Sequence, residues 1–350
     1  MLDKAHAFHA MGSNRELKMN ITSESKTMPL FSESPRRLLT REARIRLAYM
    51  IGAIVILPFV FSFFDERYAT LNNFGSLMRQ ASVLLLVASA ASAPILMGTI
   101  DLSIGAMVSL NAVVAGLFAQ SFGQIAVFLA LPIGFACGIV NGLIISTFRL
   151  PSFLVTLGTS FAFSGLALAL SGGFPVTLAP GNLYGLFNGT INVWFPVSII
   201  WAIVVWGITV VVLGRTAFGR FVYMIGGNER ACLANGVRVG LIKTLTFGLG
   251  GLLTSLAGIL VLFQASSATA DIGSSYLLTA IAAVVIGGTP LSGGEGGVGR
   301  TIIGTIILVE LVQGMFIVGM SSAIQQIIEG TVVVLAMLLT LDRKKIDIVK

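Results

Sequence analysis

Apolar residues dominate the chain from Leu47 to Leu341, and short polar intervals divide this region into segments of roughly membrane-spanning length. A helix needs about 20 mostly apolar residues to cross a bilayer. By this criterion we place about ten candidate spans, at 47–64, 77–98, 105–120, 124–147, 151–170, 196–214, 241–265, 276–286, 301–318 and 322–341. The pattern therefore predicts an all-α, polytopic membrane protein whose transmembrane domain is 47–341.

Two of the apolar regions are interrupted by polar, glycine-rich breaks. Residues 98–105, GTIDLSIG, place Asp101 between two spans without a loop of ordinary length. The short run 276–286 leads directly into GGTPLSGGEGGVGR at 287–300. Irregular backbone is tolerated at membrane depth only where protein or a water-filled cavity supplies its hydrogen bonds. We therefore expect broken or re-entrant segments, and a version with about eight crossings stays open.

The longest polar interval inside the apolar region is 215–243, RTAFGRFVYMIGGNERACLANGVRVGLIK. The glycines at 226–227 interrupt the chain, Asn228 is a favoured helix cap, and Glu229 suits the positive end of a short helix. Gly236 is placed to end that helix after roughly two turns. A capped helix held at the membrane surface predicts a docking element. A solvated loop that only orients the chain fits the composition equally well.

Composition and charge support the membrane assignment. Hydrophobic residues make up 55% of the chain and charged residues only 11%, with a mean hydropathy of +0.94, whereas a soluble chain carries about 25% charge. The net charge of +7 does not indicate nucleic-acid binding, because the basic residues gather at the termini and in 215–243. Cytoplasmic segments have this bias. We therefore place both termini in the cytoplasm, with 1–46 as a tail expected to be disordered and 342–350 as a short tail.

The sequence carries no recognisable catalytic or metal-binding motif. Cys137 and Cys232 lie far apart and are interpreted as free thiols, and both histidines, His6 and His9, fall in the N-terminal tail. The GxGxxG match at 294–299 has no strand before it, so dinucleotide binding is rejected. No GxxxxGK(S/T) motif is present, so a partner must hold ATP if ATP drives transport. Nothing indicates an enzyme or a bound cofactor.

Polar side chains inside the spans supply candidates for a translocation pathway. A charged side chain at the centre of a membrane helix costs about 2.5–3.5 kcal/mol, so each should face a cavity or a partner group. Neutral amides and hydroxyls suit a hydroxyl-rich substrate such as a sugar, because they both donate and accept hydrogen bonds, and an aromatic ring can stack on the sugar. The candidates are Asp101, Ser103, Asn111, Phe161, Glu310 and Gln313.

These polar residues also have structural interpretations. Asp101 can cap the third span at its cytoplasmic end, which is the preferred interpretation. Glu310 and Glu329 can support proton coupling, but pairing with the glutamines of the last two spans, which locks helices together, is preferred. Phe161 can face lipid. Small residues at four-residue spacing in the fourth span are interpreted as helix-packing positions; they are Gly134, Gly138 and Gly142.

Four blocks of the sequence carry a family resemblance. They are MGTIDLSIGAMVSLNAVVAG (97–116), LPSFLVTLGTSFAFSGLAL (150–168), GRTAFGRFVYMIGGNERACLANGV (214–237) and AIAAVVIGGTPLSGGEGGVGRTIIG (280–304). In this order they resemble permease subunits of bacterial ABC sugar importers, closest to the ribose-type permeases, which share a superfamily with the branched-chain amino acid permeases. The resemblance departs from the family pattern at Thr99, where a glycine is usual, and at Pro290, where a serine is common.

The resemblance implies a transport subunit of the bacterial inner membrane that pairs with a second copy or a related permease and works by alternating access. It implies ATPase subunits on the cytoplasmic side, which would hold ATP and Mg, and a periplasmic binding protein that delivers the sugar. The chain itself would bind no cofactor and would otherwise contact membrane lipid. The coupling helix would be formed by Gly226, Gly227, Asn228, Glu229, Arg230, Ala231, Ala234 and Gly236.

Three alternatives stay open at this point. The first is a permease for branched-chain amino acids or another small solute, although a neutral substrate is favoured because only Arg79 lies near the membrane interior on the outer side. The second is a proton-coupled secondary transporter that uses Glu310 and Glu329. The third is a non-transporting membrane subunit that binds partners through 215–243.

Overall fold

The structure is a computed structural model that describes residues 41–192 and 194–340, and within these residues the chain folds almost entirely into α-helices. Its contacts divide the chain into 1–44 and 45–350, and the description below concerns the second unit. The predicted tails, 1–46 and 342–350, lie outside the described residues except for 41–46, where the first helix begins. His6 and His9 also lie outside the described residues.

Seven of the described helices are long and apolar enough to cross a membrane. They are α2 (Leu71–Leu96), α3 (Ile104–Phe122), α4 (Ala130–Phe148), α5 (Ser152–Ser171), α7 (Val197–Arg215), α10 (Val239–Ala265) and α12 (Val298–Ile317). Shorter apolar helices are α1 (Arg41–Phe64), α11 (Tyr276–Ile286) and α13 (Ser322–Thr340). Each of these helices overlaps one predicted span, so the all-α polytopic fold is confirmed.

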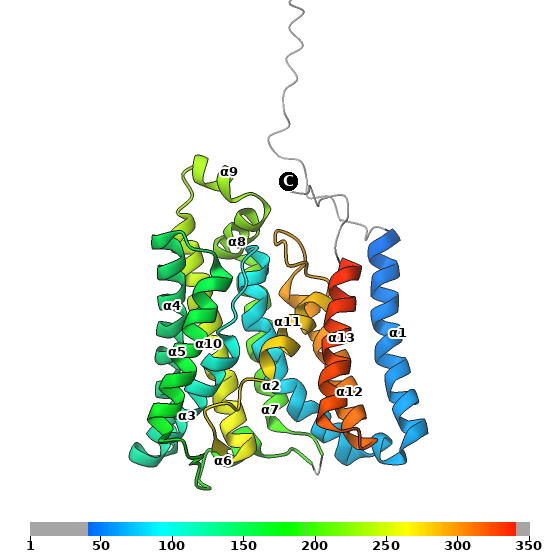
Figure 1. The fold of residues 1–350 in the computed structure, drawn as a ribbon. Coiled ribbons are helices and arrows are strands. Elements are labelled where there is room, and N and C mark those ends of the chain that lie inside the picture. The colour runs from blue at the N-terminus through cyan, green and yellow to red at the C-terminus, as the bar shows by residue number, and fades with distance from the viewer. Residues whose placement is uncertain (1–40, 193, 341–350) are drawn as a thin grey trace, which may run out of the picture. The chain divides into compact units, whose positions relative to one another are not determined.

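Shorter elements connect these helices. They are η1 (Glu66–Ala69), η2 (Gln124–Leu129), α6 (Tyr184–Asn188), α8 (Ala217–Gly227), α9 (Glu229–Ala234) and two short strands, β1 (Val176–Thr177) and β2 (Ser267–Ala268). The strands pair antiparallel, which joins the loop after α5 to the end of α10. Figure 1 shows α6 and α9 at opposite ends of the helices.

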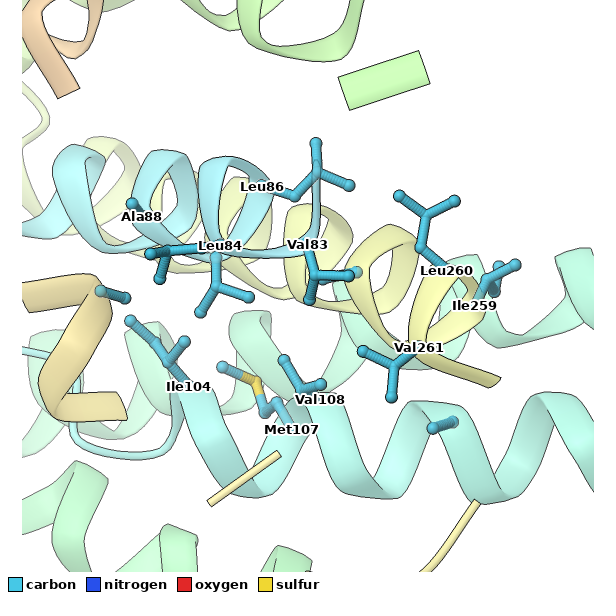
Figure 2. Packing of buried hydrophobic residues seen from close by; sticks show 14 of the residues in the cluster. Val83, Leu84, Leu86, Ala88, Ile104, Met107, Val108, Ile259, Leu260 and Val261 are labelled. Carbon is cyan, nitrogen blue, oxygen red and sulfur yellow. The ribbon is translucent and has the colours of Figure 1, made fainter. Parts of the chain in front are cut away.

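The centre of the fold is formed by α2, α3 and α10. Buried residues make up 83%, 78% and 78% of their apolar windows, against 22% for α5 and 28% for α7, so the latter two are peripheral. The side chains of the central helices meet in one cluster, seen in Figure 2, which includes Val83 and Leu84 of α2, Met107 and Val108 of α3 and Leu260 of α10. The central helices therefore fix the position of everything attached to them.

The three glycines at four-residue spacing in α4 face α10. A Cβ atom at Gly138 would overlap the carbonyl group of Phe247, and one at Gly142 would overlap the backbone of Thr244. Ser255 of α10 donates a hydrogen bond to the Ala130 carbonyl at 2.6 Å. The predicted packing role of these glycines is thus confirmed, because only residues without side chains permit so close an approach.

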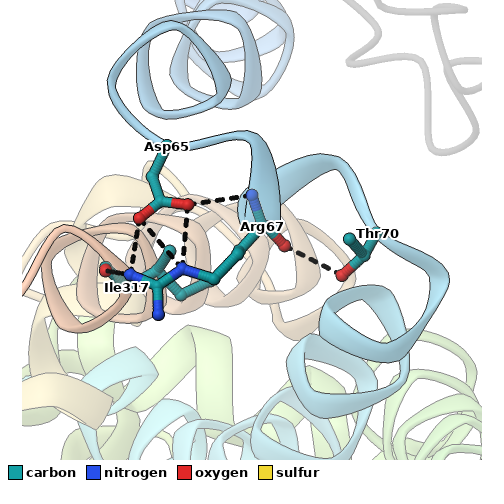
Figure 3. Close-up of polar contacts among 4 residues, drawn as sticks. All are labelled: Asp65, Arg67, Thr70 and Ile317. Carbon is teal, nitrogen blue, oxygen red and sulfur yellow. Dashed lines mark hydrogen bonds and ion pairs between the residues drawn. The ribbon is translucent and has the colours of Figure 1, made fainter.

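A polar clamp joins the end of α1 to the end of α12 (Figure 3). The Asp65 carboxylate accepts hydrogen bonds from the Arg67 amide and guanidinium, and Arg67 Nη2 also donates to the Ile317 carbonyl at 3.1 Å. Hydrogen bonding to Arg67 holds the pKa of Asp65 below its ordinary value. Thr70, which donates to the Arg67 carbonyl at 2.8 Å, caps α2.

Candidate functional site

The polar interval between α7 and α10 contains the predicted capped helix. Asn228 Oδ1 accepts a hydrogen bond from the Ala231 amide at 3.0 Å, so it caps α9. The helix ends at Ala234, and Gly236 has a φ of 77°, a left-handed conformation suited to glycine. The predicted cap and stop are confirmed. The preceding amphipathic helix α8 was not predicted, and it includes the glycines that the sequence suggested would interrupt the chain.

One face of α9 packs against the rest of the chain and the other face is exposed. Cys232 is the buried residue of α9, and it packs into a cluster formed by the ends of α2, α7 and α8. Glu229 is 2.7 Å from Lys243 Nζ at the start of α10, so it has a partner within the chain. The exposed face that remains is Arg230, Ala231, Leu233 and Ala234.

Behind α9 the chain makes a backbone-on-backbone contact that we call the glycine junction: Leu96, Gly98, Gly226, Gly293 and Gly294. The Gly294 amide donates to the Leu96 carbonyl at 2.9 Å. A Cβ atom at Gly226 would overlap that carbonyl and the Gly294 amide, and one at Gly293 would overlap the Gly98 amide. Three of the four blocks that carry the family resemblance therefore meet at one point.

The break between α2 and α3 is an irregular segment, and α5 binds two of its backbone amides. The Ile100 amide donates to Ser152 Oγ at 3.0 Å and the Leu102 amide donates to Thr156 Oγ1 at 2.9 Å. This is the protein-supplied hydrogen bonding that irregular backbone requires inside a membrane. The predicted broken segment is thus present, with its partners on a helix distant in sequence.

Asp101 is buried in this break, but it does not cap α3. Its Oδ1 accepts from the Ser103 amide at 2.9 Å and from Ser103 Oγ at 2.6 Å. Ser103 itself occupies the cap position, without a side-chain cap bond, and its hydroxyl accepts from Asn141 Nδ2 at 2.8 Å. The cap interpretation is corrected, because the carboxylate binds an amide that precedes the first helical turn.

A cavity of about 340 Å³ lies beside this break, between α3, α5 and the start of α11. Its walls are partly apolar, formed by side chains such as Leu102, Leu168 and Leu277. Its polar lining is Ser109, Ser160, Ser164, Asp271 and Ser274. Hydroxyls with one carboxylate among apolar walls make a site that can hold a small neutral solute by hydrogen bonds.

Comparison with known proteins identifies the family. The model of the branched-chain amino acid transport system permease component matches residues 73–338. The chain belongs to this permease family. The match covers all four resemblance blocks, so the permease is a multi-pass transport subunit rather than an enzyme. No solved structure gives a significant match to it.

Several curated relatives of the permease are ribose transporters. The ribose import permease of Bacillus subtilis is 38% identical over 296 residues, covering 83% of this chain and 91% of the relative. The ribose import permease of Escherichia coli K12 is 35% identical over 318 residues, covering 89% and 98%. The autoinducer 2 import permease of Yersinia enterocolitica is 32% identical over 262 residues, covering 74% and 72%. The resemblance to ribose-type permeases is confirmed.

The predicted pathway residues of the permease are scattered over the fold. Gln313 joins α12 to α2: it donates to Asn73 Oδ1 at 2.8 Å and accepts from Gln80 Nε2 at 2.5 Å. Asn111 donates to the Met107 carbonyl of its own helix at 2.7 Å, while the Phe161 side chain is 74% exposed. The half-buried Glu310 lies on α12 beside Gln313 but does not bond to it within the described residues.

Among the described residues, none of the six predicted pathway positions lines the cavity. The polar lining residues that the sequence did not reveal are Ser109, Ser160, Ser164, Asp271 and Ser274. Ser160 and Ser164 are four residues apart and therefore share one face of α5. That spacing was the available signal in the sequence. Serine is also common where membrane helices pack together, so the spacing alone did not distinguish a cavity-lining face from a helix-packing face.

Proposed function

We propose that the chain is the membrane-spanning permease of an ATP-driven importer that carries a small neutral solute, most simply a monosaccharide, across the bacterial inner membrane. The family match and the ribose import permeases among its relatives support this proposal. The observation that carries it is the α9 helix, which is capped, anchored by Cys232 and exposed on one face. Such a helix suits docking into a groove of a partner protein.

In this proposal α9 docks on an ATPase subunit that holds ATP and Mg. Ala231 and Ala234 permit close approach, and Arg230 is exposed and forms no ion pair within the described part of the chain. A second copy or a related permease completes the membrane unit. A periplasmic binding protein delivers the solute at the opposite end, where α6 and the β1–β2 pair lie.

The cavity beside α5 is the proposed stopping point of the solute. The hydroxyls of Ser160 and Ser164 and the carboxylate of Asp271 line it, and they are hydrogen-bonding groups of the kind that bind sugar hydroxyls. The starts of the two interrupted helices, α3 and α11, border it, as in transporters whose broken helices surround the substrate. Glu310 is not among the residues that line the cavity, which weakens the proton-coupled alternative.

The docking proposal is tested by purifying the chain from its own membranes in mild detergent, identifying the co-purifying proteins and assaying ATP hydrolysis. The wild-type chain should retain an ATPase subunit. Ala231→Trp, on the exposed face of α9, should lose it while membrane insertion stays normal. Asn72→Trp, exposed at the other end of the fold, is the matched control and should retain the subunit. Equal retention by both variants would refute docking through α9.

A further inference from the structure

We infer that the glycine junction is the contact through which movement of the α8–α9 element reaches the cavity, and that Gly226 is its positioning residue. The inference rests on the proposed function, since it concerns how ATPase docking is coupled to transport. It assigns roles to Leu96, Gly226 and Gly294, which neither the family match nor the relatives' names assign.

The first step is that α9 cannot move independently of the junction. Cys232 of α9 packs in the same buried cluster as Val222 and Ile225 of α8 and Leu96 of α2. Tyr223 of α8 donates to the Gly296 carbonyl at 3.3 Å. A displacement of α9 is therefore passed to α8 and to the glycine-rich segment after α11.

The second step is that the junction is made by backbone atoms, including the Leu96 carbonyl, with no side chain between the segments to absorb a displacement. Gly98, Gly293 and Gly294 have φ values of 72°, 77° and 75°, which residues with a Cβ rarely adopt. Gly226 approaches the Leu96 carbonyl so closely that an added Cβ would overlap it. Packed backbone of this kind is not continuously deformable, so a small shift on one side moves the other.

The third step is that two parts of the cavity lining are connected to the junction. From Gly98 the irregular break leads within a few residues to Leu102 and Gly105, which line the cavity. From Gly293 the chain leads back through the short helix α11 to Leu277, which lines the cavity next to Gly105. One contact can therefore shift both parts of the lining against Ser160 of α5.

The chain supplies a matched pair of glycine variants. A Cβ atom at Gly226 would meet the Leu96 carbonyl and the Gly294 amide, whereas one at Gly214 meets nothing within 4 Å. Gly226 lies at the end of α8 and Gly214 at the end of α7, so neither belongs to α9. Gly226→Ala and Gly214→Ala therefore differ in the junction and not in the docking surface.

The experiment uses the complex of permease, ATPase and binding protein in vesicles, and measures ribose uptake per ATP hydrolysed. Gly214→Ala should match the wild type. Gly226→Ala should keep the ATPase bound and lose about fivefold or more of the ratio, as expected for a disturbed coupling between sites. Equal ratios in the two variants would overturn the inference, whereas a wild-type complex that neither binds an ATPase nor transports would instead refute the proposed function.

A second measurement keeps the inference testable if Gly226→Ala does not fold. Spin labels are placed on a chain with the glycines intact and its two cysteines replaced, at the exposed positions Arg220 of α8, Leu278 of α11 and Leu170 of α5. On binding an ATP analogue, the Arg220–Leu278 distance should stay constant while the Leu278–Leu170 distance changes. A comparable change in both distances would contradict transmission through the junction.

Discussion

At the residue scale, Asn228 and Gly236 define α9 by local interactions alone. The cap is a hydrogen bond from the Ala231 amide to the Asn228 side chain, three residues earlier, and the stop is a left-handed glycine just after the last turn. Both depend only on residues that are close in sequence. The sequence was therefore sufficient to predict them. Ser160, Ser164 and Asp271 were not predictable in this way, because their role depends on which helices surround them.

The cap can be tested by substitution. Asn228→Ala removes the acceptor of the Ala231 amide and should destabilise the start of α9 by about 0.5–2 kcal/mol. We expect faster proteolysis of the segment between α7 and α10 and weaker ATPase retention. Asn228→Ser keeps a capping oxygen and should behave like the wild type. Identical proteolysis of the two variants would mean that the cap does not order α9.

The cavity hydroxyls can be tested in the same way. Ser164→Ala removes the hydroxyl without adding bulk, and with it a hydrogen bond to the solute worth about 0.5–1.5 kcal/mol. Ribose uptake should fall by about two- to tenfold while ATPase retention is unchanged. Ser171→Ala, at the end of α5 and outside the cavity lining, is the control. Normal uptake by Ser164→Ala would place the solute elsewhere.

At the scale of elements, the hydrophobic pattern predicted the spans because a membrane helix must be apolar over most of its length. It missed α8, whose 11 residues include Arg220 and whose buried side is formed by Gly219, Val222 and Ile225. A short amphipathic helix in a polar interval is not distinguished by average hydropathy. The glycine junction was likewise invisible, since it joins three segments that are remote in sequence.

The glycine packing of α4 on α10 gives a prediction at this scale. Gly138→Leu inserts a side chain where the Phe247 carbonyl lies, so it should destabilise the fold by about 1–3 kcal/mol or more. Thermal stability in detergent should fall accordingly. Gly158→Leu on α5, where an added Cβ meets nothing within 4 Å, should leave it unchanged. Equal stability of the two variants would contradict the close α4–α10 packing.

At the scale of the molecule, a buried centre of α2, α3 and α10 carries peripheral helices, and the cavity lies between the centre and peripheral α5. The proposed docking element and the proposed solute site are separate, and the glycine junction lies between them in the chain of contacts. This arrangement suits a subunit that receives movement from one partner and passes it to a solute.

The most direct test of the account is transport by the purified complex in sealed vesicles, measured with radiolabelled ribose and, separately, leucine. We predict uptake of ribose that requires ATP and the binding protein, is lost with Ala231→Trp and is unaffected by Glu310→Gln. ATP-driven uptake of leucine alone would identify an amino acid permease. Uptake without ATP that is abolished by Glu310→Gln would contradict the account and indicate a proton-coupled transporter.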